Sequence, residues 1–134
     1  MLVQKTEFRI RYAETDKMGY VYYGRYAEFF EVARVEALRE IGVNYNDLEK
    51  NGISMPVLKY SVEFKKPVYY DEKIIIETVI SKKPETRIEF DFKTYNQKKE
   101  CVNIAKVELV FIDSKLKKPI KAPDFLLNSL LNYL

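Results

Sequence analysis

One segment of this chain has the periodicity of a long helix, whereas most of the remainder has the pattern of strands. From Arg25 to Ile41, apolar residues recur at the three- and four-residue spacing of an amphipathic helix. The residues on the main apolar face are Tyr26, Phe29, Phe30, Ala33, Ala37 and Ile41. Val32, Val35 and Leu38 widen this face, so we expect a sheet to wrap around the helix rather than to touch it along one edge.

Alternation of apolar and polar residues predicts a first strand around Phe8–Tyr12 and further strands after the helix. The later elements are expected at 46–52 (a helical turn), 57–64, 72–81, 86–95 and 100–112 (strands) and 125–133 (a short helix). Apolar residues on both faces of the last strand predict a central strand that is largely covered. This order predicts an α+β fold, with one domain of residues 1–134 and an antiparallel sheet of about five strands.

A single helix cannot cover both faces of a five-stranded antiparallel sheet. One face of the sheet therefore needs another partner. We expect a homo-oligomer in which a second copy of the chain is joined either edge to edge or face to face.

Several residue types that common catalytic sites require are absent. The chain has no histidine, which excludes Ser-His-Asp and Cys-His chemistry and the HExxH zinc site. The single cysteine, Cys101, excludes an intramolecular disulfide and is expected to be a buried structural thiol. The four glycines lack the spacing of P-loop and Rossmann motifs. We therefore expect no metal and no cofactor.

The charge and hydropathy of the chain also limit its partners. The net charge of +3 is too small for a nucleic-acid-binding surface, which needs a strongly basic stripe. Residues 1–8 contain no apolar signal segment, and no apolar run approaches membrane-spanning length. We expect a cytoplasmic protein that binds no nucleic acid and does not insert into membranes.

An acidic loop directly precedes the long helix. Glu14, Thr15 and Asp16 follow the first strand, and an aromatic segment bounded by Gly19 and Gly24 leads into the helix. A carboxylate at this place stands beside the free backbone N–H groups of a helix N-terminus, which can stabilise an oxyanion. This combination of groups suits attack on a carbonyl.

A wider pattern surrounds this loop, made of Tyr12, Glu14, Thr15, Asp16, Gly19, Val21, Tyr23, Tyr26, Glu31, Arg34 and Glu36. It resembles the signature of the 4-hydroxybenzoyl-CoA thioesterase family of hotdog-fold proteins. The likeness is closest to the bacterial branch of acyl-CoA thioesterases linked to the Tol–Pal envelope system. Further matching positions, Tyr60, Val62, Phe64, Pro67, Tyr70, Asp71 and 105–113, extend the resemblance over nearly the whole chain.

The resemblance implies a hotdog fold, in which a curved antiparallel sheet wraps around one central helix. It also implies dimers that often pair into tetramers, and hydrolysis of acyl-CoA thioesters without a metal. The substrate would be an acyl-CoA, and its chain length is left open.

Carried over by position, the resemblance makes Asp16 the catalytic carboxylate, which attacks the thioester carbonyl directly or activates a water. The N–H groups of Tyr23 and Gly24 would polarise the thioester oxygen. Gly24 would also let the acyl group approach the backbone closely. Tyr22 and Tyr26 would line the substrate pocket. The Tol–Pal-linked branch usually has histidine at the position of Tyr23, so we assign the role there to the main-chain donor.

Basic residues are candidates for binding the phosphates of coenzyme A. They are Lys65, Lys66, Lys82, Lys83 and Arg87. Because charged turns are usually only solvated, each of these residues is a weaker candidate than Asp16.

Two other carboxylates and one aromatic cluster have competing interpretations. Glu14 is interpreted as a surface acid, and Glu31 as a helical ion-pair partner of Arg34 or Arg25. The cluster at 20–23 either recognises an aromatic acyl group or packs at an interface.

Two alternatives to acyl-CoA hydrolysis stay open. Tyr23 is compatible with a non-catalytic hotdog module that binds acyl-CoA or a protein. A thioesterase for acyl carrier protein is the other alternative. A hotdog hydratase or dehydratase is disfavoured because that chemistry in related proteins depends on histidine.

Overall fold

The computed structural model describes all residues from 1 to 134. In chain order the elements are β1 (Leu2–Arg9), η1 (Tyr12–Glu14), η2 (Tyr23–Arg25), α1 (Tyr26–Glu40), α2 (Tyr45–Lys50), β2 (Ile53–Ser54), β3 (Val57–Phe64), β4 (Lys73–Ile80), β5 (Arg87–Tyr95), β6 (Cys101–Val110), β7 (Ile112–Asp113), β8 (Lys118–Pro119) and α3 (Asp124–Leu131). The η elements are single 3₁₀ turns.

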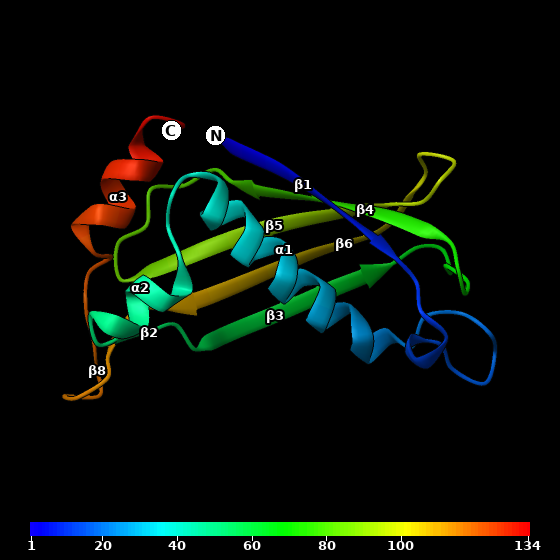
Figure 1. The fold of residues 1–134 in the computed structure, drawn as a ribbon, viewed down its shortest axis with the longest axis horizontal. Helices are drawn as coiled ribbons and strands as arrows, with labels where there is room; N and C mark the ends of the chain where they lie inside the picture. The colour runs from blue at the N-terminus through cyan, green and yellow to red at the C-terminus, as the bar shows by residue number, and fades with distance from the viewer.

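One antiparallel sheet of five strands forms the body of the molecule, in the order β1-β4-β5-β6-β3. Helix α1 lies along one face of this sheet, and the loop before α1 lies at the opposite end from α3 (Figure 1). Strands β2, β7 and β8 form a second, small sheet. The expected arrangement of one long helix against a five-stranded antiparallel sheet is confirmed.

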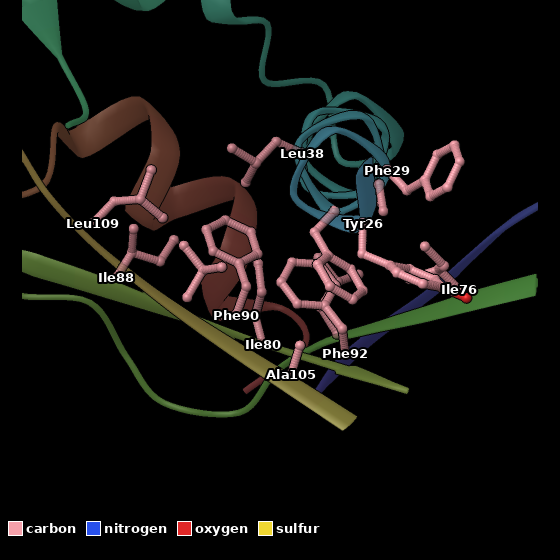
Figure 2. Close-up of a cluster of buried hydrophobic side chains, with 14 of the residues drawn as sticks. Tyr26, Phe29, Leu38, Ile76, Ile80, Ile88, Phe90, Phe92, Ala105 and Leu109 are labelled. Carbon is pink, nitrogen blue, oxygen red and sulfur yellow. The ribbon is translucent and has the colours of Figure 1, made fainter. Parts of the chain in front are cut away.

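The main core lies between α1 and the inner face of the sheet. Phe30 stacks on Phe92 with a distance of 4.8 Å between ring centroids, and Phe90 stacks beside Phe92. Figure 2 shows Tyr26 pointing from α1 toward the strands that carry Phe92 and Ile76, and Phe29 packs on Phe8 of β1 with 5.1 Å between the ring centroids. The predicted apolar face of the helix is therefore its buried face.

The outer face of the sheet is charged. Arg87 pairs with Glu108 at 2.7 Å, and Lys106 pairs with Asp91 at 3.6 Å. Beside Lys106 on β6, Ile104 is 37% exposed, whereas Val102 and Val110 are buried. The last strand is central in the sheet, as predicted, but its outer face is covered only in part.

The beginning of the chain differs from the prediction. Strand β1 starts at Leu2 and ends at Arg9, so the last three residues of the predicted strand, 10–12, lie outside it. Tyr12 lies instead in the first 3₁₀ turn, with 77% of its surface exposed. Ile10 is nevertheless buried in the core. For this reason the alternation of apolar and polar residues extends past the end of the strand.

None of the helices has the length and apolar content that crossing a membrane requires.

Candidate active site

The acidic loop is a short hairpin fixed by its own backbone. Asp16 N–H donates to Tyr20 C=O at 2.9 Å, and Gly19 N–H donates to Asp16 C=O at 3.0 Å. Gly19 has a φ of +89°, a left-handed conformation that glycine adopts without steric cost. This turn fixes the backbone on either side of Asp16.

Asp16 is half-buried, and one of its carboxylate oxygens is engaged within the loop. Oδ1 accepts a hydrogen bond of 2.8 Å from Met18 N–H. This bond orients the carboxyl group and leaves Oδ2 without a protein donor. The side chain is therefore positioned but not neutralised by a cation.

A second segment of the chain holds the loop in place. Val21 N–H donates to Val68 C=O at 2.9 Å, and Tyr20 forms an isolated β-bridge with Tyr69. Lys65 N–H and Lys66 N–H both donate to Val102 C=O, which ties this second segment to β6. The loop, the segment after β3 and the large sheet thus form one connected unit.

The start of the helix presents free backbone donors. Arg25 N–H donates to Tyr22 C=O at 2.9 Å, and Tyr26 N–H donates to Tyr23 C=O. The N–H groups of Tyr23 and Gly24 precede these bonds and have no backbone acceptor. They are the two donors that the sequence predicted for an oxyanion.

These segments enclose a cavity of about 380 Å³. It is lined by Asp16, Met18, Tyr20, Val21, Tyr23, Tyr26, Phe64, Lys65, Lys66, Pro67 and Val68. The structure thus brings together five of the predicted site residues: Asp16, Tyr23, Tyr26, Lys65 and Lys66. The remaining lining residues include apolar and aromatic side chains, as a pocket for an acyl group needs.

Tyr22 and Gly24 have a different relation to the cavity from the one expected. Tyr22 does not line it, because its ring packs on Tyr23 with 4.6 Å between the centroids. A Cβ atom at Gly24 would lie only 2.7 Å from Cε2 of Tyr22. The free space at Gly24 is therefore filled by a ring of the same protein chain.

The three remaining basic candidates lie elsewhere. Lys82, Lys83 and Arg87 line a separate cavity of about 240 Å³ at the start of β5. Along β5 this end is roughly 25 Å from the end beside the acidic loop. Lys82 also pairs with Glu89 at 3.3 Å, so these residues cannot join Lys65 and Lys66 in a single protomer's cavity.

The charges of the two cavity lysines are not equivalent. Lys66 forms an ion pair with Glu100, and the hydrogen bond from Lys66 lowers the pKa of that carboxyl group. Lys65 has no acidic partner within ion-pair distance. Lys65 is therefore the freer cation for an anionic ligand.

The interpretation of Glu14 as a surface acid is wrong. Glu14 is 3% exposed, and its two carboxylate oxygens accept hydrogen bonds from the backbone N–H and the guanidinium of Arg11. Glu14 thus closes the first 3₁₀ turn. The sequence could not show this burial. The backbone N–H that donates to the carboxylate is present in every residue except proline, so it leaves no residue pattern.

The expected partners of Glu31 are also wrong. Arg25 pairs with Glu28 at 3.1 Å, and Arg34 Nε donates to the hydroxyl of Tyr45 at 3.2 Å.

Cys101 is half-buried rather than buried, and its thiol donates to the backbone C=O of Asn103.

Sequence reasoning did not assign Met18, Phe64, Pro67 or Val68 to the site. Phe64 and Pro67 were part of the family pattern, and that was the only signal available for them. Their place depends on the pairing of β3 with β6, which brings the end of β3 beside α1.

Comparison with known proteins assigns the family. The thioesterase-like superfamily matches residues 10–130. YneP of Bacillus subtilis (strain 168), provisionally named an acyl-CoA thioesterase, is 34% identical over 90% of this chain and 88% of its own length. The acyl-CoA thioester hydrolase YbgC of Escherichia coli O157:H7 is 31% identical over 86% of each chain. Among solved structures, the DHNA-CoA thioesterase of Staphylococcus aureus has a TM-score of 0.87 at 37% identity, covering 100% of this chain and 85% of that one.

The fold and the family match define a hotdog protein of the thioesterase class. The protein belongs to the thioesterase-like superfamily. The 4-hydroxybenzoyl-CoA thioesterase shares the fold at a TM-score of 0.87 and 17% identity. The narrower link to the Tol–Pal branch stays a prediction.

Tyr26 connects this site to stability at high pH. Burial, with a smaller effect from the charge of Glu72, raises the pKa of Tyr26 far above its usual value of about 10. The folded protein holds this proton more tightly than the unfolded chain. The resulting stabilisation is complete below pH 10 and is lost as the pH rises above that value. Tyr26→Phe should therefore make the free energy of unfolding fall less steeply above pH 10.

Urea unfolding at pH 8, 10 and 11 measures this effect. Tyr12→Phe is the control, because the Tyr12 ring is 77% exposed and should not alter the pH dependence. Equal slopes for wild type and Tyr26→Phe would contradict the assignment.

Proposed function

We propose that the protein is an acyl-CoA thioesterase that hydrolyses its substrate in the cavity beside Asp16. One observation carries this proposal: a positioned carboxylate, Asp16, lines the same cavity as Tyr23, whose backbone N–H at the helix start has no backbone acceptor. Relatives that match most of the chain are named as acyl-CoA thioesterases or thioester hydrolases.

Asp16 supplies the negative group that the reaction requires. Either Oδ2 attacks the thioester carbonyl carbon, or it removes a proton from a water that attacks there. In both routes the C–S bond breaks and coenzyme A leaves as a thiol. Water supplies the oxygen and the proton that complete the free acid and the thiol.

The N–H groups at the helix start supply the partial positive charge that the oxyanion requires. The carbonyl oxygen gains negative charge during attack, and the N–H groups of Tyr23 and Gly24 are placed to donate to it. Because these are main-chain groups, a histidine side chain at position 23 is not required.

Lys65 and Lys66 are proposed to bind the phosphates of coenzyme A at the cavity mouth. Lys82, Lys83 and Arg87 could contribute only from another protomer, because they lie at the far end of the sheet. The cytoplasm stays the predicted location.

Asp16→Asn should lower kcat about 10²–10⁴-fold. The asparagine keeps an oxygen that accepts from Met18 N–H, so the loop should keep its shape while losing the nucleophile or base. Release of free thiol from a panel of short, long and aromatic acyl-CoAs is measured with a colorimetric reagent.

Glu31→Gln, at an exposed helix position, is the matched control and should leave kcat unchanged. A folded and fully active Asp16→Asn protein would contradict the assignment of Asp16 as the catalytic carboxylate. Saturable acyl-CoA binding by the wild type with no thiol release would instead identify a binding module.

Gly24→Ala should lower kcat/KM about tenfold, which corresponds to roughly 1.4 kcal/mol of lost transition-state binding. The structure gives a reason, since the new methyl group meets the Tyr22 ring at 2.7 Å and must displace it or the N–H donors. The double variant Tyr22→Ala/Gly24→Ala removes that contact and should recover most of the loss.

The Tyr22→Ala single variant serves as the reference for this pair. If the double variant remains as impaired as Gly24→Ala, the acyl group rather than Tyr22 needs the space at Gly24.

A second copy of the chain is proposed to cover the free edge of β3. This edge strand has apolar residues on the helix side that remain open, with Val57 49% and Phe64 48% exposed. Eight residues of unpaired edge and an exposed apolar strip are features that a paired edge would remove. The outer face, with its ion pairs, has less need of cover. We therefore favour an edge-to-edge homodimer, which would place a second protomer beside the cavity; pairing of dimers into tetramers stays a prediction.

Val57→Lys should weaken this dimer by at least about tenfold, because it would bury an unpaired charge at the edge. Sedimentation equilibrium over a range of concentrations measures the dissociation constant. Ile104→Lys, on the outer face of β6, is the control and should not change it. The reverse result would place the interface on the outer face.

A further inference from the structure

Three polar side chains on the inner face of the sheet are completely buried and have no hydrogen-bond partner. They are Thr78 and Thr94, whose hydroxyl groups are unpaired, and Asn103, whose amide oxygen and nitrogen are both unpaired. An unpaired buried polar group destabilises the folded state, because it loses its hydrogen bonds to water and gains none in the protein. Isosteric valine and leucine would fill the same space without this cost, so these residues need a reason other than stability.

Two of the three lie together beside the cavity. Thr94 on β5 faces Asn103 on β6, and Asn103 in turn faces Phe64 on β3. Residues directly opposite each other in an antiparallel pair have Cβ atoms about 5 Å apart. Phe64 lines the cavity, so Asn103 is one side chain behind the cavity wall.

The wall at this point is made of two aromatic rings that can give way. The ring centroids of Tyr26 and Phe64 are 5.7 Å apart, and Phe64 is 48% exposed on the edge strand. A change of the Phe64 rotamer would remove the ring that separates Asn103 from the cavity. The hydroxyl of Tyr26 also has no protein hydrogen-bond partner, and Figure 2 shows the ring pointing from α1 toward the sheet.

Thr78 is placed differently. It faces Phe92, in the next row of inner-face residues, and its strand β4 is separated from β3 by β5 and β6. It is therefore farther from the cavity than Thr94 and Asn103, although its hydroxyl is equally buried and unpaired.

We propose that Thr94 and Asn103 form a polar end to the acyl pocket, which hydrogen-bonds a hydroxyl or carbonyl group on the acyl moiety. This inference rests on the proposed thioesterase function and names its substrate class. Asn103 can donate to and accept from the same group, and Thr94 can do either. A plain hydrocarbon leaves both side chains unpaired, so the pocket discriminates against it.

The test compares matched pairs of acyl-CoAs that differ by one hydroxyl group. The probes are 4-hydroxybenzoyl-CoA against benzoyl-CoA, and a chain hydroxylated near its end against the same plain chain. The wild type should prefer the hydroxylated member of at least one pair by about tenfold or more in kcat/KM, the effect of one or two hydrogen bonds. Asn103→Leu and Thr94→Val should each remove most of that preference.

Two features of the design separate selectivity from folding. Thr78→Val removes a similarly buried hydroxyl away from the cavity and should leave the preference unchanged. Thermal unfolding should show Asn103→Leu and Thr94→Val to be as stable as the wild type or more so. If Asn103→Leu fails to fold, the smaller change Thr94→Val still decides the matter.

Each other outcome counts against the proposal. A wild type that hydrolyses both members of every pair equally overturns it and leaves the thioesterase function intact. A preference that survives both substitutions also overturns it, because groups other than Thr94 and Asn103 then recognise the hydroxyl. A wild type that releases no thiol from any acyl-CoA overturns the proposed function together with this inference.

Discussion

The burial of one aromatic helix face against the sheet fixes everything else in this molecule. Phe30 is completely buried and stacks on Phe92, and Tyr26 is 3% exposed at the first turn of α1. Since these contacts occur at the N-terminal half of the helix, they fix the position of its first turn. The direction of the free N–H groups at Tyr23 and Gly24 is therefore set by core packing rather than by the loop alone.

The long helix, the number of long strands and the acidic loop could be predicted from the sequence, because each has a local signal. The 3.6-residue period between Arg25 and Ile41 predicted a helix with nearly the same bounds as α1. Asp16 and the helix start are close along the chain, so their proximity needed no tertiary information. Phe64, in contrast, reaches the cavity only through the pairing of β3 with β6. Register between distant strands leaves no mark that a single sequence can show.

The same distinction explains the incorrect predictions. Glu14 is an ordinary acidic residue in the sequence, yet it closes a buried turn. Apolar residues on both faces of β6 indicated that the strand is largely covered, whereas Ile104 on its outer face stays exposed between the charged residues Lys93 and Glu63 of the neighbouring strands. Burial depends on what a neighbouring strand contributes, and the sequence of one strand does not contain that information.

The segments around the cavity are held together by hydrogen bonds between main-chain atoms. These bonds run from Val21 N–H to Val68 C=O and from Tyr22 N–H to Glu14 C=O, and the N–H groups of Lys65 and Lys66 tie the wall to β6 at Val102 C=O. Main-chain bonds of this kind are indifferent to the identity of the side chains that project from the same residues. The lining can therefore be exchanged one residue at a time while Asp16 and the helix start keep their geometry. Such a scaffold can acquire a new substrate range by gradual substitution, without passing through inactive intermediates.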